Sequence, residues 1–215
     1  MAMTDARTSK KPGKSRAGLY AAGVALLVLA GIVVDTTVVV IGSEQDARQQ
    51  AFDPDRYGAA EFPRIRDTVI ERAPDAVTLA QALAADKKGA VADYATAGTF
   101  PVFPVTVTGV VGDGKSGIYD VQVEGLEGVK VRVQTGPAIN GTELRDIPGD
   151  IAFGQFKNQI EYQDAGAGIN RAMSAEALAG LDRDALPGKT ITVTGAFSMV
   201  NPKNWLITPV ALEVQ

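Results

Sequence analysis

The sequence contains neither cysteine nor histidine among its 215 residues. Without cysteine, disulfides, thiolate metal sites and cysteine nucleophiles are all excluded. Without histidine, the commonest general base is missing and a Ser-His-Asp triad cannot form. A metal ion could be held only by oxygen ligands, as Ca²⁺ or Mg²⁺ are. We predict no metal site and no cofactor.

An excess of positive charge is also missing. The formal net charge is −4, whereas a nucleic-acid-binding protein needs a basic face, so we expect no nucleic-acid partner. Apolar residues make up 46% of the chain and charged residues 21%, which is typical of a globular protein. The chain is long enough for one core with a helical annex.

The N-terminal region combines a basic tail with an uncharged apolar run. Residues 1–16 carry five basic residues against one acid, Asp5, and Ala17–Val34 contains no charge. A helix of this length spans roughly 27 Å, close to the hydrocarbon core of a bilayer. By the positive-inside rule, 1–16 is predicted to be a cytoplasmic tail, 17–34 a signal-anchor helix in the inner membrane, and the rest periplasmic. The alternatives are a cleaved signal peptide and a buried core helix.

Residues 35–97 are predicted to form a strand and a helical annex. The β-branched stretch Asp35–Ile41 favours a strand, and Ser43 marks a helix start. Phe52–Ala73 is predicted to be helical, entered through an Asp-Pro turn. A second helix is expected to begin at Thr78 as N-cap and to fade at Lys87–Gly89.

After Gly98 the apolar residues alternate with period two, which indicates half-buried strands. Three strands are expected before a long irregular stretch with some helix, Gly136–Pro187, and two after it. The expected strands are Val105–Val111, Tyr119–Val123, Val129–Val133, Ile191–Phe197 and Leu206–Leu212. This order predicts a fold that is mainly β with α, in which 98–215 forms an OB-like five-stranded antiparallel barrel. An open β-sandwich is the alternative. Phe103 and Phe197 are predicted in the core, and Trp205 partly exposed.

Three motifs are interpreted as structural. Gly109–Ser116 matches the P-loop pattern letter for letter, but a strand pattern follows it where a phosphate-binding loop requires a helix. We therefore predict a hairpin and no bound nucleotide. Asn140-Gly141-Thr142 matches a glycosylation acceptor but is expected to be a turn. The acid pairs Asp146/Asp150 and Glu161/Asp164 are expected on the solvated surface.

Two motifs in the irregular stretch carry a resemblance. Gly136–Asp146 fits Gly-Pro-x-Ile-x-Gly-Thr-x-Leu-Arg-Asp, and Phe153–Tyr162 fits Phe-x-x-Phe-x-Asn-Gln-Ile-Glu-Tyr. The chain after about Val34 resembles a family of predicted periplasmic lipoproteins of unknown function, domain of unknown function 2291. The resemblance implies an extracytoplasmic location and an association with sugar-uptake ABC transporters. This chain lacks the cysteine that accepts the lipid. We expect the helix Ala17–Val34 to anchor the protein in place of the lipid.

We therefore expect a membrane-anchored periplasmic binding or accessory protein and not an enzyme. Its partners would be the bilayer through residues 17–34 and either transporter components or a small sugar-like ligand. The predicted binding residues share a polar character and lie in the long excursion between the third and fourth strands: Arg145, Asp146, Asn158, Gln159, Glu161 and Tyr162. The alternatives are a carboxylate-based hydrolase or lyase and a structural subunit of an envelope complex.

Overall fold

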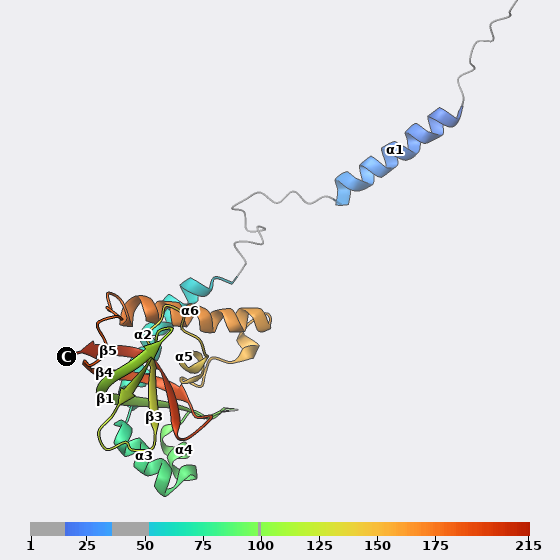
Figure 1. Cartoon of the computed structure of the whole chain (residues 1–215). Helices are drawn as coiled ribbons and strands as arrows, with labels where there is room; N and C mark the ends of the chain where they lie inside the picture. Colours follow the sequence, from blue (N-terminus) through green and yellow to red (C-terminus); the bar gives the residue numbers. More distant parts are fainter. Residues whose placement is uncertain (1–15, 36–51, 99) are drawn as a thin grey trace, which may run out of the picture. The chain divides into compact units, whose positions relative to one another are not determined.

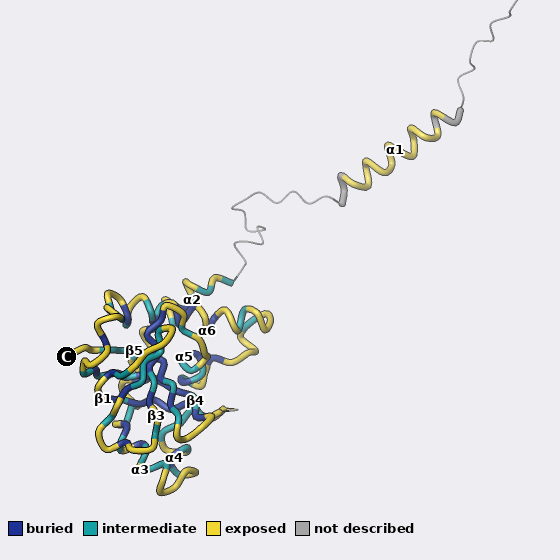
Figure 2. The backbone as a smooth tube through the Cα atoms, viewed as in Figure 1, coloured by how far each residue is buried: buried dark blue, intermediate teal, exposed yellow. Residues whose placement is uncertain are grey.

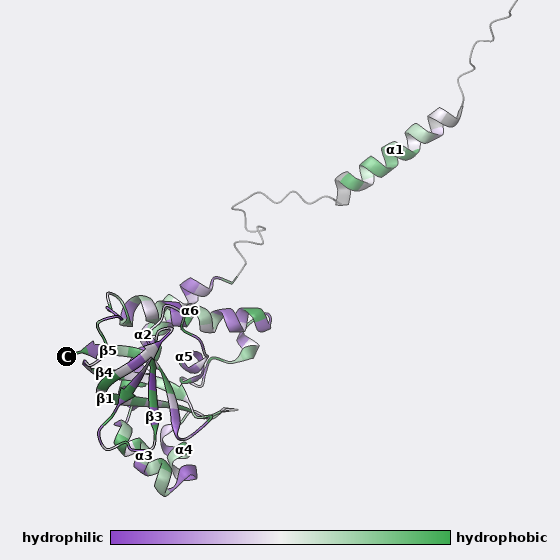
Figure 3. Cartoon of the chain, viewed as in Figure 1, coloured by the Kyte–Doolittle hydropathy of each residue, from purple (hydrophilic) through white to green (hydrophobic). Residues whose placement is uncertain are grey.

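The computed structural model describes residues 16–35, 52–98 and 100–215, and the chain divides into two units, Met1–Ala51 and Phe52–Gln215. In the first unit, helix α1 runs over Arg16–Asp35 and is largely hydrophobic (Figure 3). The prediction of a helix at Ala17–Val34 is thus confirmed. Its prediction as a membrane span is not supported, since no helix within those described ranges is long and apolar enough to cross a membrane. The predicted tail at 1–15, the strand at 36–41 and the helix start at Ser43 lie outside the described residues.

The helices that open the second unit begin at aspartate caps. Asp53 accepts hydrogen bonds from the backbone N–H groups of Asp55 and Arg56, and Pro54 opens α2 (Pro54–Arg72), as predicted. Helix α3 (Ala76–Ala85) starts at Asp75 and not at Thr78. The Asp75 carboxylate lies three residues earlier and accepts from the N–H of Thr78 itself at 3.4 Å, so Thr78 falls inside the first turn. Another cap, Asp86, starts α4 (Lys87–Tyr94), where the helix was expected to fade.

Five strands follow and form the sheet: β1 (Val102–Lys115), β2 (Ile118–Gln122), β3 (Lys130–Gln134), β4 (Thr190–Ser198) and β5 (Asn204–Val214). Their order is β1-β2-β3-β5-β4, with β4 paired to β1, so the pairings close on themselves. Figure 1 labels β1, β3, β4 and β5 of this sheet. This confirms the predicted fold class, a mainly β protein of five strands with helices.

One pairing departs from the antiparallel prediction. Strand β5 runs parallel to β3, from the pair Lys130–Asn204 to the pair Val133–Ile207. The reason is the path of the chain. In the meander, β3 runs in the direction of β1, and β5, antiparallel to β4, also runs in that direction. When β5 meets β3, the two strands are therefore parallel.

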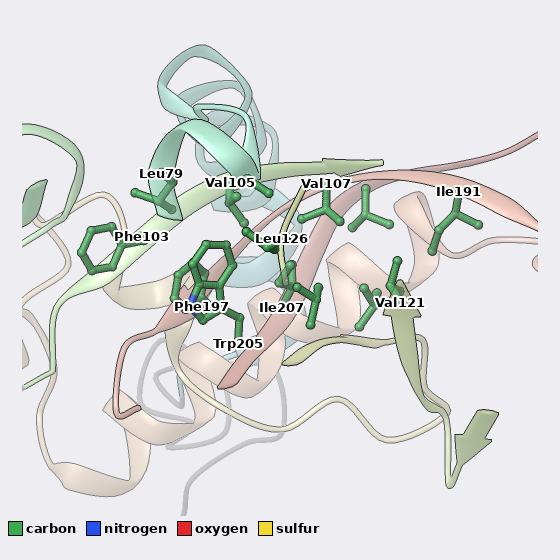
Figure 4. Close-up of a cluster of buried hydrophobic side chains, with 14 of the residues drawn as sticks. Leu79, Phe103, Val105, Val107, Val121, Leu126, Ile191, Phe197, Trp205 and Ile207 are labelled. Atoms are coloured by element: carbon green, nitrogen blue, oxygen red, sulfur yellow. The ribbon is translucent and has the colours of Figure 1, made fainter. Parts of the chain in front are cut away.

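The sheet encloses a core of aliphatic and aromatic side chains (Figure 4). The rings of Phe103 and Phe197 stack at 5.6 Å between centroids, and those of Phe197 and Trp205 at 4.7 Å. Trp205 is fully buried, so its predicted partial exposure is wrong. Its indole can be buried because Nε1 donates to the carbonyl of Pro202 at 2.9 Å, which leaves no polar atom unpaired. Leu79 of α3 packs against the same cluster.

A second apolar cluster joins residues of α2, α5 and α6 to residues of the sheet. Figure 2 shows buried backbone in both the helices and the strands. The excursion between β3 and β4 contributes α5 (Glu143–Asp146), a 3₁₀ turn (Phe153–Gln155) and α6 (Gln159–Ala177). Helices α2 and α6 touch backbone to backbone, because a Cβ added at Gly58 would overlap the carbonyl of Gly168. This close contact holds α6 against α2, and α6 also packs against α5, where the candidate site lies.

Candidate functional site

A cavity of about 430 Å³ opens where the start of β1 and the end of β4 meet α5 and α6. Its wall mixes apolar and polar groups from segments far apart in the chain. Its lining residues include Val102, Thr142, Arg145, Asp146, Ile151, Tyr162 and Ser198. A cavity of this size, with an apolar wall and a few convergent polar groups, is typical of small-molecule sites.

Arg145 is the central polar residue of this wall. It is only 7% exposed, which is unusual for a charged side chain and requires partners. Its Nε donates to Asp146 Oδ1 at 2.8 Å, and Nη1 donates to the carbonyl oxygen of Tyr162 at 3.3 Å. Its guanidinium also lies over the Tyr162 ring, 3.7 Å from the centroid, as a cation–π contact. Arg145 is therefore held in one orientation by two elements, α5 and α6.

Two hydroxyl groups in the wall are each bonded to a carboxylate. Thr142 Oγ1 donates to Asp146 Oδ2 at 2.6 Å. Ser198 Oγ, at the end of β4, donates to Glu143 Oε1 at 3.2 Å. The two carboxylates fix the direction of both hydroxyl hydrogens, and Asp146 itself also lines the cavity.

Glu143 lies in a largely buried polar network between α5 and the sheet. Gln134 Nε2 donates to Thr208 Oγ1 at 2.8 Å, and Thr208 Oγ1 in turn lies 3.4 Å from Glu143 Oε2. Burial raises the pKa of Glu143 above its ordinary value, and the nearby charge of Asp146 acts in the same direction. The hydrogen bonds from Ser198 and Thr208 oppose this rise.

The structure brings together three of the six predicted site residues. Arg145, Asp146 and Tyr162 line the cavity, whereas Asn158, Gln159 and Glu161 do not. Asn158 caps α6, with Oδ1 accepting from the N–H of Glu161 at 2.9 Å, and Glu161 Oε2 accepts from the N–H of Lys157 at 2.9 Å. These two side chains form a helix cap, and Gln159 is exposed beside them.

Sequence reasoning missed Thr142, Glu143 and Ser198. Thr142 and Glu143 belong to the motif that contains Arg145, so their place in the sequence could have indicated that they belong to the site. No sequence feature indicated Ser198, because it reaches the cavity through the pairing of β1 with β4 and lies 55 positions from Glu143.

Of the three motifs interpreted as structural, the P-loop-like segment has the expected surroundings, whereas Asp146 of the acid pairs is only partly exposed and lines the cavity. Lys115 ends β1, Ser116 and Gly117 turn with positive φ, and Ile118 begins β2, so the P-loop-like segment is a hairpin. Gly141 has a φ of 113° but lies in irregular backbone, so the structure does not show the turn expected at Asn140-Gly141-Thr142. Asp150 pairs with Arg64 and Asp146 with Arg145, so these two acids do not act as a pair. Within the described residues, no group of three or more acidic side chains is placed to hold a metal ion.

Comparisons with known proteins indicate the fold and the family of this chain. The chain is similar to the crystal structure of an OB-fold protein from Thermotoga maritima MSB8, with a TM-score of 0.61 and 20% identity, and the match covers 77% of this chain and 99% of that one. At this identity the likeness shows the fold alone, which is an OB-fold. No curated protein matches the sequence. Residues 22–213 match the family described as "Predicted periplasmic lipoprotein (DUF2291)", and the chain therefore belongs to this periplasmic family of unknown function.

Proposed function

We propose that this protein is a periplasmic binding protein that takes a small sugar-like ligand in the cavity beside Arg145. The observation that carries the proposal is the orientation of Arg145. The Arg145 guanidinium is almost fully buried and is held by Asp146 and Tyr162. Burying a charge costs free energy, so a buried arginine is expected to have a role in the structure or in binding a ligand. Arg145 lines the cavity, and its Nη2 donates to no residue in the described part of the chain. An acceptor oxygen from a ligand fits this position.

The rest of the wall also suits a small hydroxylated molecule. Tyr162, Val102 and Ile151 offer apolar surface, and Thr142, Ser198 and Asp146 offer oxygen atoms. Sugars present both kinds of surface, C–H faces and hydroxyl edges, so a wall of this composition can contact both. The volume of about 430 Å³ falls within the usual range for small-ligand sites.

The proposal is tested by ligand-induced stabilisation of the full-length protein. A ligand that binds only the folded state raises the melting temperature with concentration. We expect one or more monosaccharides to do so, and Arg145→Lys to abolish the shift, because an ammonium keeps the charge beside Asp146 but loses the planar fork. Arg171→Ala is the matched control, since Arg171 lies on α6 but lines a different cavity. Failure of every monosaccharide to stabilise the wild-type protein would contradict the proposal.

Attachment to the inner membrane through Ala17–Val34, with the N-terminus in the cytoplasm, is a separate proposal. It is supported by the basic flank of the sequence and by the exposed apolar side chains of α1, among them Leu26 and Leu29. The chain has no cysteine for a lipid to modify. Because no described helix has the properties of a span, the test must be direct. We expect full-length protein to stay with membranes after carbonate extraction, and its release would contradict the attachment.

Association with a sugar ABC transporter is also proposed, and only the family resemblance supports it. Cross-linking in cells followed by purification of the full-length protein tests it. Recovery of transporter subunits with the wild-type protein would support the association. Their recovery at equal levels with an unrelated periplasmic protein would count against it.

A further inference from the structure

The cavity wall has an asymmetry in its hydrogen-bonding groups. Ser198 has its hydroxyl hydrogen directed to Glu143 Oε1, and Thr142 has its own directed to Asp146 Oδ2. A hydroxyl whose hydrogen is already donated can only accept from a ligand through its lone pairs. Both hydroxyls therefore act as acceptors toward the cavity, and Arg145 is left as the charged donor among the lining residues.

The charges near the wall also favour a ligand group that donates hydrogen bonds. Asp146, which itself lines the cavity, and Glu143 place two carboxylates next to the hydroxyls, against the single guanidinium of Arg145. An anionic ligand group presents only acceptors, so near Ser198 and Thr142 it would face lone pairs and negative charge. A neutral hydroxyl group can donate to these oxygens and accept from Arg145 in turn.

We propose that Ser198 and Thr142 are specificity-determining residues that select a neutral polyol over sugar acids and sugar phosphates. This inference rests on the proposed function, because it concerns the ligand of the same cavity. In the bound state, two ligand hydroxyls donate to Ser198 and Thr142, and a third ligand oxygen accepts from Arg145.

Glu143 acts as the positioning residue for Ser198. Gln134 donates to Thr208, and Thr208 is in turn placed to donate to Glu143 Oε2. With Thr208 bonded to one carboxylate oxygen, the other oxygen faces Ser198 and keeps its hydrogen away from the cavity. An amide in place of the carboxylate would direct its NH₂ at Ser198 and turn the hydroxyl hydrogen toward the ligand. Glu143 thus decides whether Ser198 accepts or donates.

The first experiment compares matched ligands on the full-length protein by calorimetry. The probes are glucose with glucuronate and glucose 6-phosphate, and galactose with galacturonate. We expect at least one neutral sugar to bind about tenfold more tightly than its acid, as the loss of one or two hydrogen bonds implies. Tighter binding of the acids would overturn the selection and leave the binding function standing. If no probe of either kind bound, both proposals would fail.

The second experiment uses variants with a matched control. Ser198→Ala and Thr142→Val should each weaken binding of the neutral sugar by about fivefold to tenfold. Thr108→Val is the control, because Thr108 makes a similar hydroxyl contact, 3.1 Å to Thr192, on the exposed side of the sheet. Glu143→Gln should reduce the preference for the neutral sugar over its acid. An unchanged preference in Glu143→Gln, with Ser198→Ala binding like the wild type, would overturn the inference.

Discussion

The guanidinium of Arg145 lies 3.7 Å from the ring centroid of Tyr162, and this contact joins α5 to the first turn of α6. The same ring is met by Phe153 and Phe156, with centroid distances of 5.8 and 5.4 Å. Tyr162 therefore links a buried charge to an aromatic cluster that extends to α2 through Tyr57. Arg145 thus contributes both to the cavity wall and to the packing of the helical layer.

Arg145→Ala is expected to lower the free energy of unfolding by about 2–3 kcal/mol. Breaking a buried ion pair leaves a carboxylate without its partner, and the cost is reduced here because the Asp146 side chain is 31% exposed. Urea denaturation of the variant measures this difference. Arg171→Ala, which removes an exposed pair with Asp55, should change stability by less than about 1 kcal/mol. Equal effects of the two substitutions would show that Arg145 has no special structural role.

Glu143→Gln is expected to change how stability depends on pH. Burial raises the pKa of Glu143, so the folded protein binds this proton more tightly than the unfolded chain does. The stabilisation from Glu143 is therefore fully present below its ordinary pKa and is lost as the pH rises through the raised value. An amide side chain cannot titrate in this range, so the Glu143→Gln variant should lack this loss. The measurement is the free energy of unfolding from about pH 4 to about pH 8. Identical pH profiles for the variant and the wild type would contradict the assignment.

Gly58→Ala is expected to destabilise the protein by roughly 1–3 kcal/mol, as overpacking does. The new Cβ would meet the carbonyl of Gly168, and the backbones of α2 and α6 would have to separate. Thermal unfolding measures the effect. Gly154→Ala is the control, because a Cβ there has no heavy atom within 4 Å. A variant at Gly58 as stable as this control would mean that the two helices adjust freely.

Lys115→Ala is expected to leave stability within about 0.5 kcal/mol of the wild type, as exposed substitutions usually do. ATP should not raise the melting temperature of either protein, because the hairpin offers no helix N-terminus for phosphate. Differential scanning fluorimetry with and without ATP checks both expectations. A shift of several degrees in the wild type that is absent in Lys115→Ala would restore the nucleotide-binding interpretation.

The strands could be predicted because their period-two pattern is local. Val131 and Val133 face the core and alternate with polar neighbours, and this information lies within a few residues of sequence. The parallel contact of β3 with β5 and the burial of Trp205 could not be predicted. The parallel contact depends on which distant strand comes to lie beside β3. The burial of Trp205 depends on how the chain turns before it, because that turn places the Pro202 carbonyl where it accepts a hydrogen bond from the indole.

The candidate site was partly predictable for the same reason. Arg145, Asp146 and Tyr162 belong to the two motifs of the same excursion, and the packing of α5 against α6 brings them together. Asn158 and Glu161 looked equally suited to binding, yet the spacing Asn-x-x-Glu before a helix also predicts a cap, which is the role that the structure shows. Ser198 joins them only through tertiary pairing, which a local pattern does not encode.

Strand β5 follows the others in chain order, and it bridges β3 and β4. A ribosome releases the chain from its N-terminus, so β1, β2 and β3 are made long before Asn204–Val214. During that interval β3 keeps an unpaired edge, and such edges are templates for aggregation. If the domain crosses the membrane during or after synthesis, it can complete its sheet only when β5 has followed. Export is therefore expected to favour chaperones that hold the early strands apart until then.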